Sequence, residues 1–295
     1  MIDGNTQLIG LIGYPVAHTL SPMMHNAAAA ALGLNVRYVP LPVAPERLPD
    51  ALRGLSALGF RGVNVTVPHK EAVLSQLDAI FPAARVIGAV NTIVIGHGRL
   101  TGFNTDWSGF LSDLERYRLA LYGRDCLVLG AGGSARAVVY ALLRRGCRVT
   151  IVARRPEQAQ RLAAELGAAF PKAMPPEIGL LDDAARLAAL LDEPILINTT
   201  PLGMEGQFSE HSPWPEDAPF PPGAFAYDLV YAPRETNFMA QARAAGRQTA
   251  NGLGMLVGQA AEAFEILTAH RPDPAVMWRA IGDFPQISPT PMEYP

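Results

Sequence analysis

A glycine-rich loop between an apolar strand and a helix constrains this chain most. The loop is Gly130-Ala131-Gly132-Gly133; the apolar segment Cys126–Leu129 precedes it and a helical pattern from Ser134 to Arg145 follows. The backbone N–H groups of such a loop, and the positive end of the helix after it, suit the pyrophosphate of a dinucleotide. Ala135 stands at the third fingerprint position, where alanine is allowed. The segment therefore predicts a Rossmann-like nucleotide site; a tight structural turn is the alternative.

Strands alternate with helices around this loop. Further strands are expected at Arg148–Ala153, Pro194–Asn198 and Ala224–Val230, with a helix at Glu157–Leu166. Such alternation predicts a parallel sheet covered on both faces, and so an α/β fold. We expect Pro171–Asp183 to be irregular.

The first third of the chain reads differently. Strands are expected at Leu8–Tyr14, Val36–Val43 and Gly62–Val67, followed by a hairpin from Ala89 to Phe103. The hairpin adds an antiparallel edge, so this sheet is expected to be mixed. Ser21 is expected to cap a helix from Met23 to Leu32. A length of 295 residues suits two domains of roughly 100–200 residues each.

The end of the second strand of the nucleotide unit indicates the cofactor. An NAD site places an acidic residue there for the ribose 2′-hydroxyl. This chain has Arg154-Arg155 after Ala153, and its first acid is Glu157 in the next helix. Two guanidinium groups favour the 2′-phosphate of NADP. Two ordinary surface arginines are the alternative.

Composition excludes several classes of partner. The net charge is −3, with 24 basic and 27 acidic residues, so a general electrostatic grip on nucleic acid or on an anionic membrane is not expected. Cys126 and Cys147 are expected to be buried thiols of a reducing compartment, which predicts a cytoplasmic protein. No leader and no membrane span is expected. His18, His25 and His69 share no ligand spacing, so no metal site is expected.

Polar residues also gather at the expected strand ends and turns of the first third. Hydroxyls, amides and one Lys–Asp pair would suit a small polyhydroxylated acid. Each residue alone also has a structural explanation: Ser21 or Asp106 could cap a helix, and Lys70 could be solvated. These residues are Ser21, Thr66, Lys70, Asn91, Asn104 and Asp106.

Taken together, these segments resemble the shikimate dehydrogenase family, from Gly13 to about Ala269. The matching motifs are Gly13–Pro22, Asn64–Lys70, Gly88–Thr92, Gly102–Asp106, Gly130–Ala135, Asn198–Met204, Asp228–Tyr231 and Gly252–Gln259. The resemblance implies NADP-dependent interconversion of shikimate and 3-dehydroshikimate in aromatic amino acid (chorismate) biosynthesis. It also implies a mixed-sheet substrate domain of residues 1–106, completed by helices in 252–295. A Rossmann-like NADP domain of residues 107–251 would lie between them.

The resemblance also implies roles for individual residues. Lys70 would be the acid/base and Asp106 its partner. The substrate would be surrounded by Thr19, Ser21, Thr66, Asn91, Tyr231 and Gln259. The cofactor would be held by Gly130, Ala131, Gly132, Gly133, Ser134, Ala135, Arg154, Arg155, Leu229, Gly252 and Met255. The expected partner is the small-molecule substrate, and the expected assembly is a monomer or a homodimer.

Two departures from the family pattern concern specificity. Thr19 stands where the family usually has serine, and its extra methyl crowds a carboxylate site. Ala153-Arg154-Arg155 replaces the usual Asn-Arg-Thr. Two alternatives stay open: a quinate/shikimate dehydrogenase that uses NAD, and a non-catalytic nucleotide-sensing relative. The presence of Lys70 and Asp106 argues against the second, because a binding module needs no proton donor.

Overall fold

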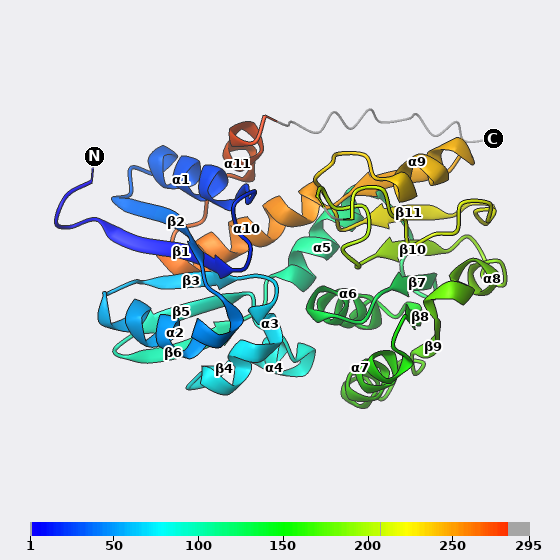
Figure 1. Cartoon of the computed structure of the whole chain (residues 1–295), viewed down its shortest axis with the longest axis horizontal. Coiled ribbons are helices and arrows are strands. Elements are labelled where there is room, and N and C mark those ends of the chain that lie inside the picture. The colour runs from blue at the N-terminus through cyan, green and yellow to red at the C-terminus, as the bar shows by residue number, and fades with distance from the viewer. Residues whose placement is uncertain (1, 207, 283–295) are drawn as a thin grey trace.

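The computed structural model describes residues 2–206 and 208–282, which form two six-stranded sheets side by side (Figure 1). The first sheet has the order β2-β1-β3-β5-β6-β4. Strand β1 runs parallel to β2 and β3, whereas β5 is antiparallel to β3 and β6, which confirms a mixed sheet. Its strands are β1 (Gln7–Gly13), β2 (Val36–Pro42), β3 (Gly62–Val65), β4 (Ala79–Ile80), β5 (Thr92–Gly96) and β6 (Arg99–Phe103).

The second sheet is the parallel one that the glycine loop and the strand–helix alternation predict. Its order is β12-β11-β10-β7-β8-β9, and all neighbouring pairs run parallel. Its strands are β7 (Asp125–Leu129), β8 (Arg148–Ala153), β9 (Glu177–Leu180), β10 (Ile195–Asn198), β11 (Phe225–Asp228) and β12 (Gln248–Asn251). The predicted α/β class is thus confirmed.

Helices cover both sheets and connect them. The α-helices are α1 (Ser21–Ala31), α2 (Leu48–Ala57), α3 (His69–Ala72), α4 (Pro82–Ile87), α5 (Asp106–Leu114), α6 (Gly133–Arg144), α7 (Pro156–Ala169), α8 (Ala184–Ala188), α9 (Asn237–Ala244), α10 (Leu253–Thr268) and α11 (Pro274–Ala280). Short 3₁₀ turns are η1 (Pro45–Arg47), η2 (Val73–Gln76), η3 (Glu115–Tyr117) and η4 (Leu181–Asp183).

Helices α5 and α10 pack together where the chain passes between the sheets (Figure 1). Their backbones come close at Gly109, where an added Cβ would lie 2.6 Å from the Gln259 nitrogen. The start of α10 packs into both cores: Met255 joins the core of the second sheet, and Leu253 joins that of the first. Further along, Phe264 covers the first sheet together with Ile9.

Several local expectations were wrong. Ser21 does not cap α1: Leu20 is the N-cap residue, and the Ser21 N–H instead donates to Thr19 Oγ1 at 3.2 Å. The segment Pro171–Asp183, expected to be irregular, contains β9, a short edge strand that pairs only with β8 and is largely exposed, so burial leaves little pattern in its sequence. Helices α4, α8 and α9 and strand β12 were not expected. The expected loose tail at 285–295 lies outside the described residues.

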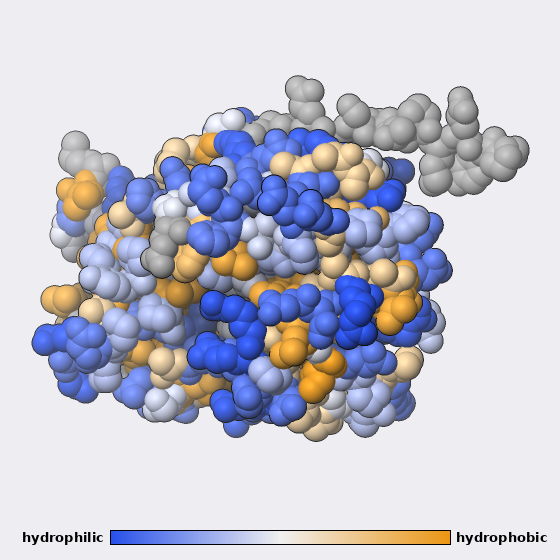
Figure 2. Space-filling model, turned by 45° about the vertical axis from the view of Figure 1, so that its right-hand side comes forward, coloured by the Kyte–Doolittle hydropathy of each residue, from blue (hydrophilic) through white to orange (hydrophobic). Residues whose placement is uncertain are grey.

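Both thiols, Cys126 and Cys147, are free and buried, as predicted. Within residues 2–206 and 208–282, no helix is long and apolar enough to cross a membrane. The same part of the chain has no cluster of three or more His, Cys, Asp or Glu side chains that could hold a metal ion. On the face shown in Figure 2, hydrophobic residues are scattered among hydrophilic ones rather than gathered into one surface.

Candidate active site

A buried ion pair between Lys70 and Asp106 is the centre of the candidate site. Lys70 lies on α3, just after β3, and Asp106 is the first residue of α5, just after β6. Lys70 Nζ donates to Asp106 Oδ2 at 2.7 Å, and the two side chains are only 13% and 6% exposed. Neither a solvated lysine nor a helix-capping aspartate describes this pair, because both side chains are buried and Thr105, not Asp106, is the N-cap residue of α5.

Two of the predicted substrate residues join this pair, Asn91 directly and Gln259 through Asn91. Asn91, which immediately precedes β5, donates from Nδ2 to Asp106 Oδ1 at 2.9 Å. The same amide lies 3.3 Å from Gln259 Oε1 on α10. Residues 70, 91, 106 and 259 therefore form one hydrogen-bonded cluster, although up to 189 positions separate them in sequence.

Among the described residues, the other predicted substrate residues make no hydrogen bond to this cluster. Thr66 is anchored by its own N–H, which donates to the Ile12 carbonyl at 2.9 Å. Ser21 is buried at the start of α1. Tyr231 packs against the core of the first sheet although it follows β11 of the second. Burial raises the pKa of Tyr231, so its hydroxyl stays a neutral donor at ordinary pH.

The glycine loop has the backbone that a dinucleotide needs. Gly130 has φ +113°, and an added Cβ there would meet Thr199 Oγ1 at 2.6 Å. No heavy atom lies within 4 Å of a Cβ placed at Gly132, so the backbone can be approached there. Helix α6 begins at Gly133 without a side-chain cap, which leaves its first N–H groups available. These features fit a pyrophosphate.

The nucleotide loop and the ion pair are neighbours. A Cβ placed at Gly133 would lie 3.3 Å from the Lys70 Cβ and 3.7 Å from its Cδ. A side chain at position 133 would therefore press on the stem of Lys70. The start of helix α6 therefore lies next to Lys70 of the hydrogen-bonded cluster.

The two predicted 2′-phosphate ligands lie beside the same loop. Arg154 and Arg155 directly follow β8, and the Gly130 N–H donates to Val152 near the end of that strand at 2.8 Å. Both arginines are exposed, and neither has a partner within the described ranges. They are therefore free to receive an anion.

Leu229, Gly252 and Met255 lie together where β11 and β12 end and α10 begins. A Cβ at Gly252 would lie 2.1 Å from the Leu229 carbonyl oxygen, so only glycine allows this approach. The Leu229 N–H donates to the Asn198 carbonyl at 2.9 Å, which holds this segment against the end of β10.

A buried carboxyl supports the same segment and was not singled out as a site residue. Asp228 accepts hydrogen bonds from Asn198 Nδ2 and the Val230 N–H, each at 2.9 Å, and from Thr236 Oγ1 at 2.7 Å. Burial raises the pKa of Asp228 to about 7, against the lowering effect of these bonds. The sequence signal for this arrangement is that two apolar strands each end in a polar residue, β10 in Asn198 and β11 in Asp228.

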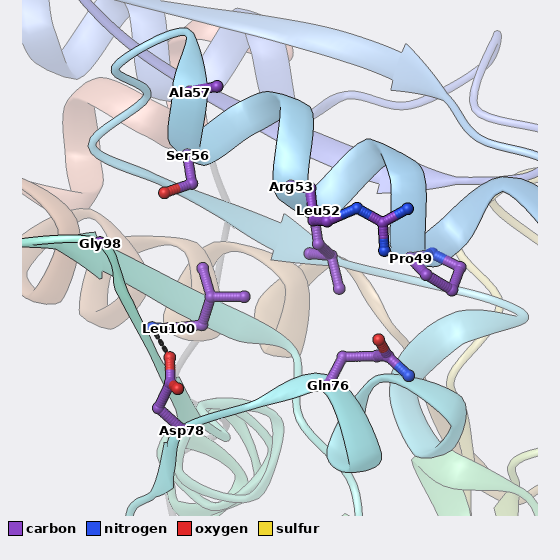
Figure 3. A pocket seen from close by; sticks show the side chains of 9 residues that line it. All are labelled: Pro49, Leu52, Arg53, Ser56, Ala57, Gln76, Asp78, Gly98 and Leu100. Carbon is purple, nitrogen blue, oxygen red and sulfur yellow. Dashed lines mark hydrogen bonds between the residues drawn. The ribbon is translucent and has the colours of Figure 1, made fainter.

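A separate groove of about 400 Å³ lies between α2 and the edge of the first sheet (Figure 3). Its charged side chains already have partners: Asp78 accepts from the Leu100 N–H at 2.7 Å, and Arg53 pairs with Asp50. None of the predicted site residues lines it.

Comparison with known proteins extends over nearly the whole chain. Residues 11–93 match the model "Shikimate dehydrogenase substrate binding domain", residues 114–178 match "Shikimate / quinate 5-dehydrogenase", and residues 252–281 match "Shikimate 5'-dehydrogenase C-terminal domain".

Individual relatives agree with these matches. The chain is 48% identical to a shikimate dehydrogenase (NADP(+)) of Salinibacter ruber, over 95% of this chain and 98% of the relative. It is also 48% identical to that of Moorella thermoacetica, over 96% and 95%. Among solved structures, a shikimate 5-dehydrogenase of Thermus thermophilus in complex with NADP(H) and shikimate matches with a TM-score of 0.81 at 41% identity, covering 93% of this chain and 98% of that one.

Proposed function

The chain belongs to the shikimate dehydrogenase family, and we propose that it is an oxidoreductase that interconverts shikimate and 3-dehydroshikimate with NADP, in aromatic amino acid biosynthesis. One observation supports this most: the buried Lys70–Asp106 pair lies directly against the start of the nucleotide helix at Gly133. A proton-transferring group and a dinucleotide loop are the two parts that reduction of a ketone requires.

Lys70 is proposed as the acid/base. The nicotinamide, when bound, donates or accepts the hydride. Reduction of a ketone leaves an oxygen that needs a proton, and oxidation needs the reverse. The Lys70 ammonium can supply that proton and stabilise the negative charge that develops on the oxygen. Asp106 holds the ammonium in position at 2.7 Å.

The remaining site residues are proposed to bind the two ligands. The substrate would contact Asn91 and Gln259 of the buried cluster, together with Thr19, Ser21, Thr66 and Tyr231. The pyrophosphate would bind along residues 130–135 and the 2′-phosphate at Arg154 and Arg155. Leu229, Gly252 and Met255 would border the nicotinamide end.

A spectrophotometric assay tests the proposal. Purified protein is mixed with shikimate or quinate and with NADP⁺ or NAD⁺, and the absorbance of the reduced cofactor is followed. We expect the fastest turnover with shikimate and NADP⁺. Turnover only with quinate and NAD⁺ would favour the quinate alternative, and no turnover with any pair would contradict the proposal.

We further propose the domain bounds 1–106 with 252–295, and 107–251, with the active site between the two parts. Closure of the two parts about the crossovers near Asp106 and Gly252 would exclude water from the reaction. Small-angle scattering should show compaction when both ligands bind.

The proposed assembly is a monomer or a homodimer, and the free thiols fit a proposed cytoplasmic location.

A further inference from the structure

A network of buried hydrogen bonds leads from β2, at one edge of the first sheet, to Asp106. It starts at Tyr38 on β2, passes through Asn64 on β3 and Thr92 on β5, and reaches Asn91. All four side chains are at most 5% exposed. The two segments at its ends are far apart in sequence, so only the sheet brings them together.

Two backbone groups, the Thr105 N–H and the Asn91 carbonyl oxygen, determine the direction of the bonds in this network. The Thr105 N–H donates to Asn91 Oδ1 at 2.8 Å, and a backbone nitrogen can only donate. Asn91 must therefore turn its Nδ2 toward Asp106. The Thr92 hydroxyl, 3.0 Å from Asn91 Oδ1, must then donate to it as well.

The same reasoning determines the two outer members. Asn64 faces the Asn91 carbonyl oxygen at 3.1 Å and Thr92 Oγ1 at 3.0 Å, and the first of these can only accept. Asn64 must present Nδ2 to both, which turns its Oδ1 toward Tyr38. The Tyr38 hydroxyl must then donate its one proton to Asn64 Oδ1, at 2.9 Å.

Tyr38 is held firmly enough to act as the fixed end of this chain. Its ring stacks on the buried His25 ring at a centroid distance of 4.2 Å, and its backbone exchanges two hydrogen bonds with the Asn26 side chain, both at 2.9 Å. Burial raises the pKa of Tyr38 well above its usual range, so the hydroxyl keeps its proton.

We infer that Tyr38, Asn64 and Thr92 are positioning residues for the Lys70–Asp106 pair, because together with the Thr105 N–H they hold the Asn91 amide with its Nδ2 toward Asp106. All donors of the chain point toward that carboxylate, so the bonds polarise one another in the same sense. A reversed Asn91 would bring a carbonyl oxygen against the carboxylate. This inference rests on the proposed function and adds three residues that act on the pair through Asn91.

The test removes hydroxyl groups one at a time along this hydrogen-bond network. Tyr38→Phe leaves Asn64 Oδ1 without its donor, and Thr92→Val breaks the central link with little change in shape. We expect each to lower kcat by about tenfold, within the range for a buried group left unpaired, while the KM for NADP stays unchanged. Thr92→Ser keeps the hydroxyl and should retain kcat within about twofold of wild type.

A double variant and a matched control separate positioning from general destabilisation. Tyr38→Phe combined with Thr92→Val should lose about as much kcat as the stronger single change, because both interrupt one chain. The control is Tyr227→Phe: Tyr227 is also fully buried and also donates to a carboxylate, Asp113 Oδ2 at 2.8 Å, but lies outside the chain. It should lower the melting temperature and leave kcat unchanged.

The inference is wrong if folded Tyr38→Phe keeps kcat within about twofold of wild type, or if Thr92→Ser loses as much as Thr92→Val. Multiplicative losses in the double variant would also overturn it. Should Tyr38→Phe not fold, the two Thr92 variants decide alone. A wild-type protein without turnover would contradict the proposed function instead, so the two failures are distinguishable.

Discussion

Replacement of Lys70 by methionine tests the proton-transfer role most directly. Methionine keeps much of the stem that lies against Gly133 and removes the ammonium. General acid/base catalysis is typically worth about 10²–10⁴ in rate, so Lys70→Met should lower kcat by about that factor. The affinity for NADP should stay within about twofold, because the glycine loop is untouched.

The same change also has a cost in stability. Asp106 is 6% exposed and would lose its partner at 2.7 Å. Breaking a buried pair costs about 3–5 kcal/mol, and the bond from Asn91 that Asp106 keeps favours the lower end. A domain with about 5–15 kcal/mol of stability would still fold, with a melting temperature lower by roughly 10 °C.

A second substitution separates the two effects. Lys70→Met combined with Asp106→Asn removes the unpaired charge, so it should recover most of the lost melting temperature. It should recover none of the lost kcat, because the proton donor is still missing.

Two measurements test the role of Lys70: steady-state kinetics with shikimate and NADP⁺, and thermal unfolding of each variant. A folded Lys70→Met enzyme with kcat within about threefold of wild type would refute the assignment, since that change is under about 1 kcal/mol of barrier. Recovery of kcat in the double variant would refute it equally.

Three further predictions concern the cofactor, the fold and pH. Arg154→Ala and Arg155→Ala should each weaken NADP binding about ten- to a hundredfold in titration calorimetry, with NAD binding unchanged and Arg161→Ala on the exposed face of α7 as the control. Gly88→Ala should cost about 1–3 kcal/mol in urea unfolding, because Gly88 has φ +69° and the added Cβ would lie 2.3 Å from the Arg136 guanidinium; an unchanged midpoint would contradict this. The folded-state pKa of Asp228, raised by burial from 3.8 to about 7, implies a stabilising contribution that is complete below pH 3.8 and lost as the pH rises toward 7. Asp228→Asn should therefore gain stability relative to wild type between pH 5 and pH 8 in urea unfolding, and an equal gap at both pH values would contradict it.

Local patterns predicted four of the six strands of the second sheet, because the signals for these strands are local. The apolar strand Cys126–Leu129, the glycine loop and the helix after it follow one another directly, and the structure places β7 and α6 there. Strand β9 was not predicted because Ile178 and Leu180 are exposed at the edge of the sheet, so their sequence shows no burial pattern. The prediction that Ser21 caps α1 was wrong because, although a serine before a proline is typical of an N-cap, the helix begins one residue earlier, with Leu20 as its N-cap.

The candidate site was predictable only in part. Lys70, Asn91 and Asp106 stand at strand ends, where polar residues attract notice, but the bond between Asn91 and Gln259 joins segments that no local pattern connects. Only the family resemblance supplied Gln259. The roles of Tyr38 and Asn64 depend on register between strands, since each is an ordinary strand residue until its neighbour is known.

Helix α10 covers one face of the first sheet, and this has a consequence for synthesis on the ribosome. Ile9 and Leu11 of β1 share a core with Phe264 and Leu267 of α10, whereas the sheet's last strand ends at Phe103. At about 5–20 residues per second, the covering residues emerge about 160 residues and on the order of 10–30 s after the strands they protect. The whole second sheet is made in that interval and can fold first. The apolar face of the nascent first sheet that α10 covers is thus left open until the second sheet has been made.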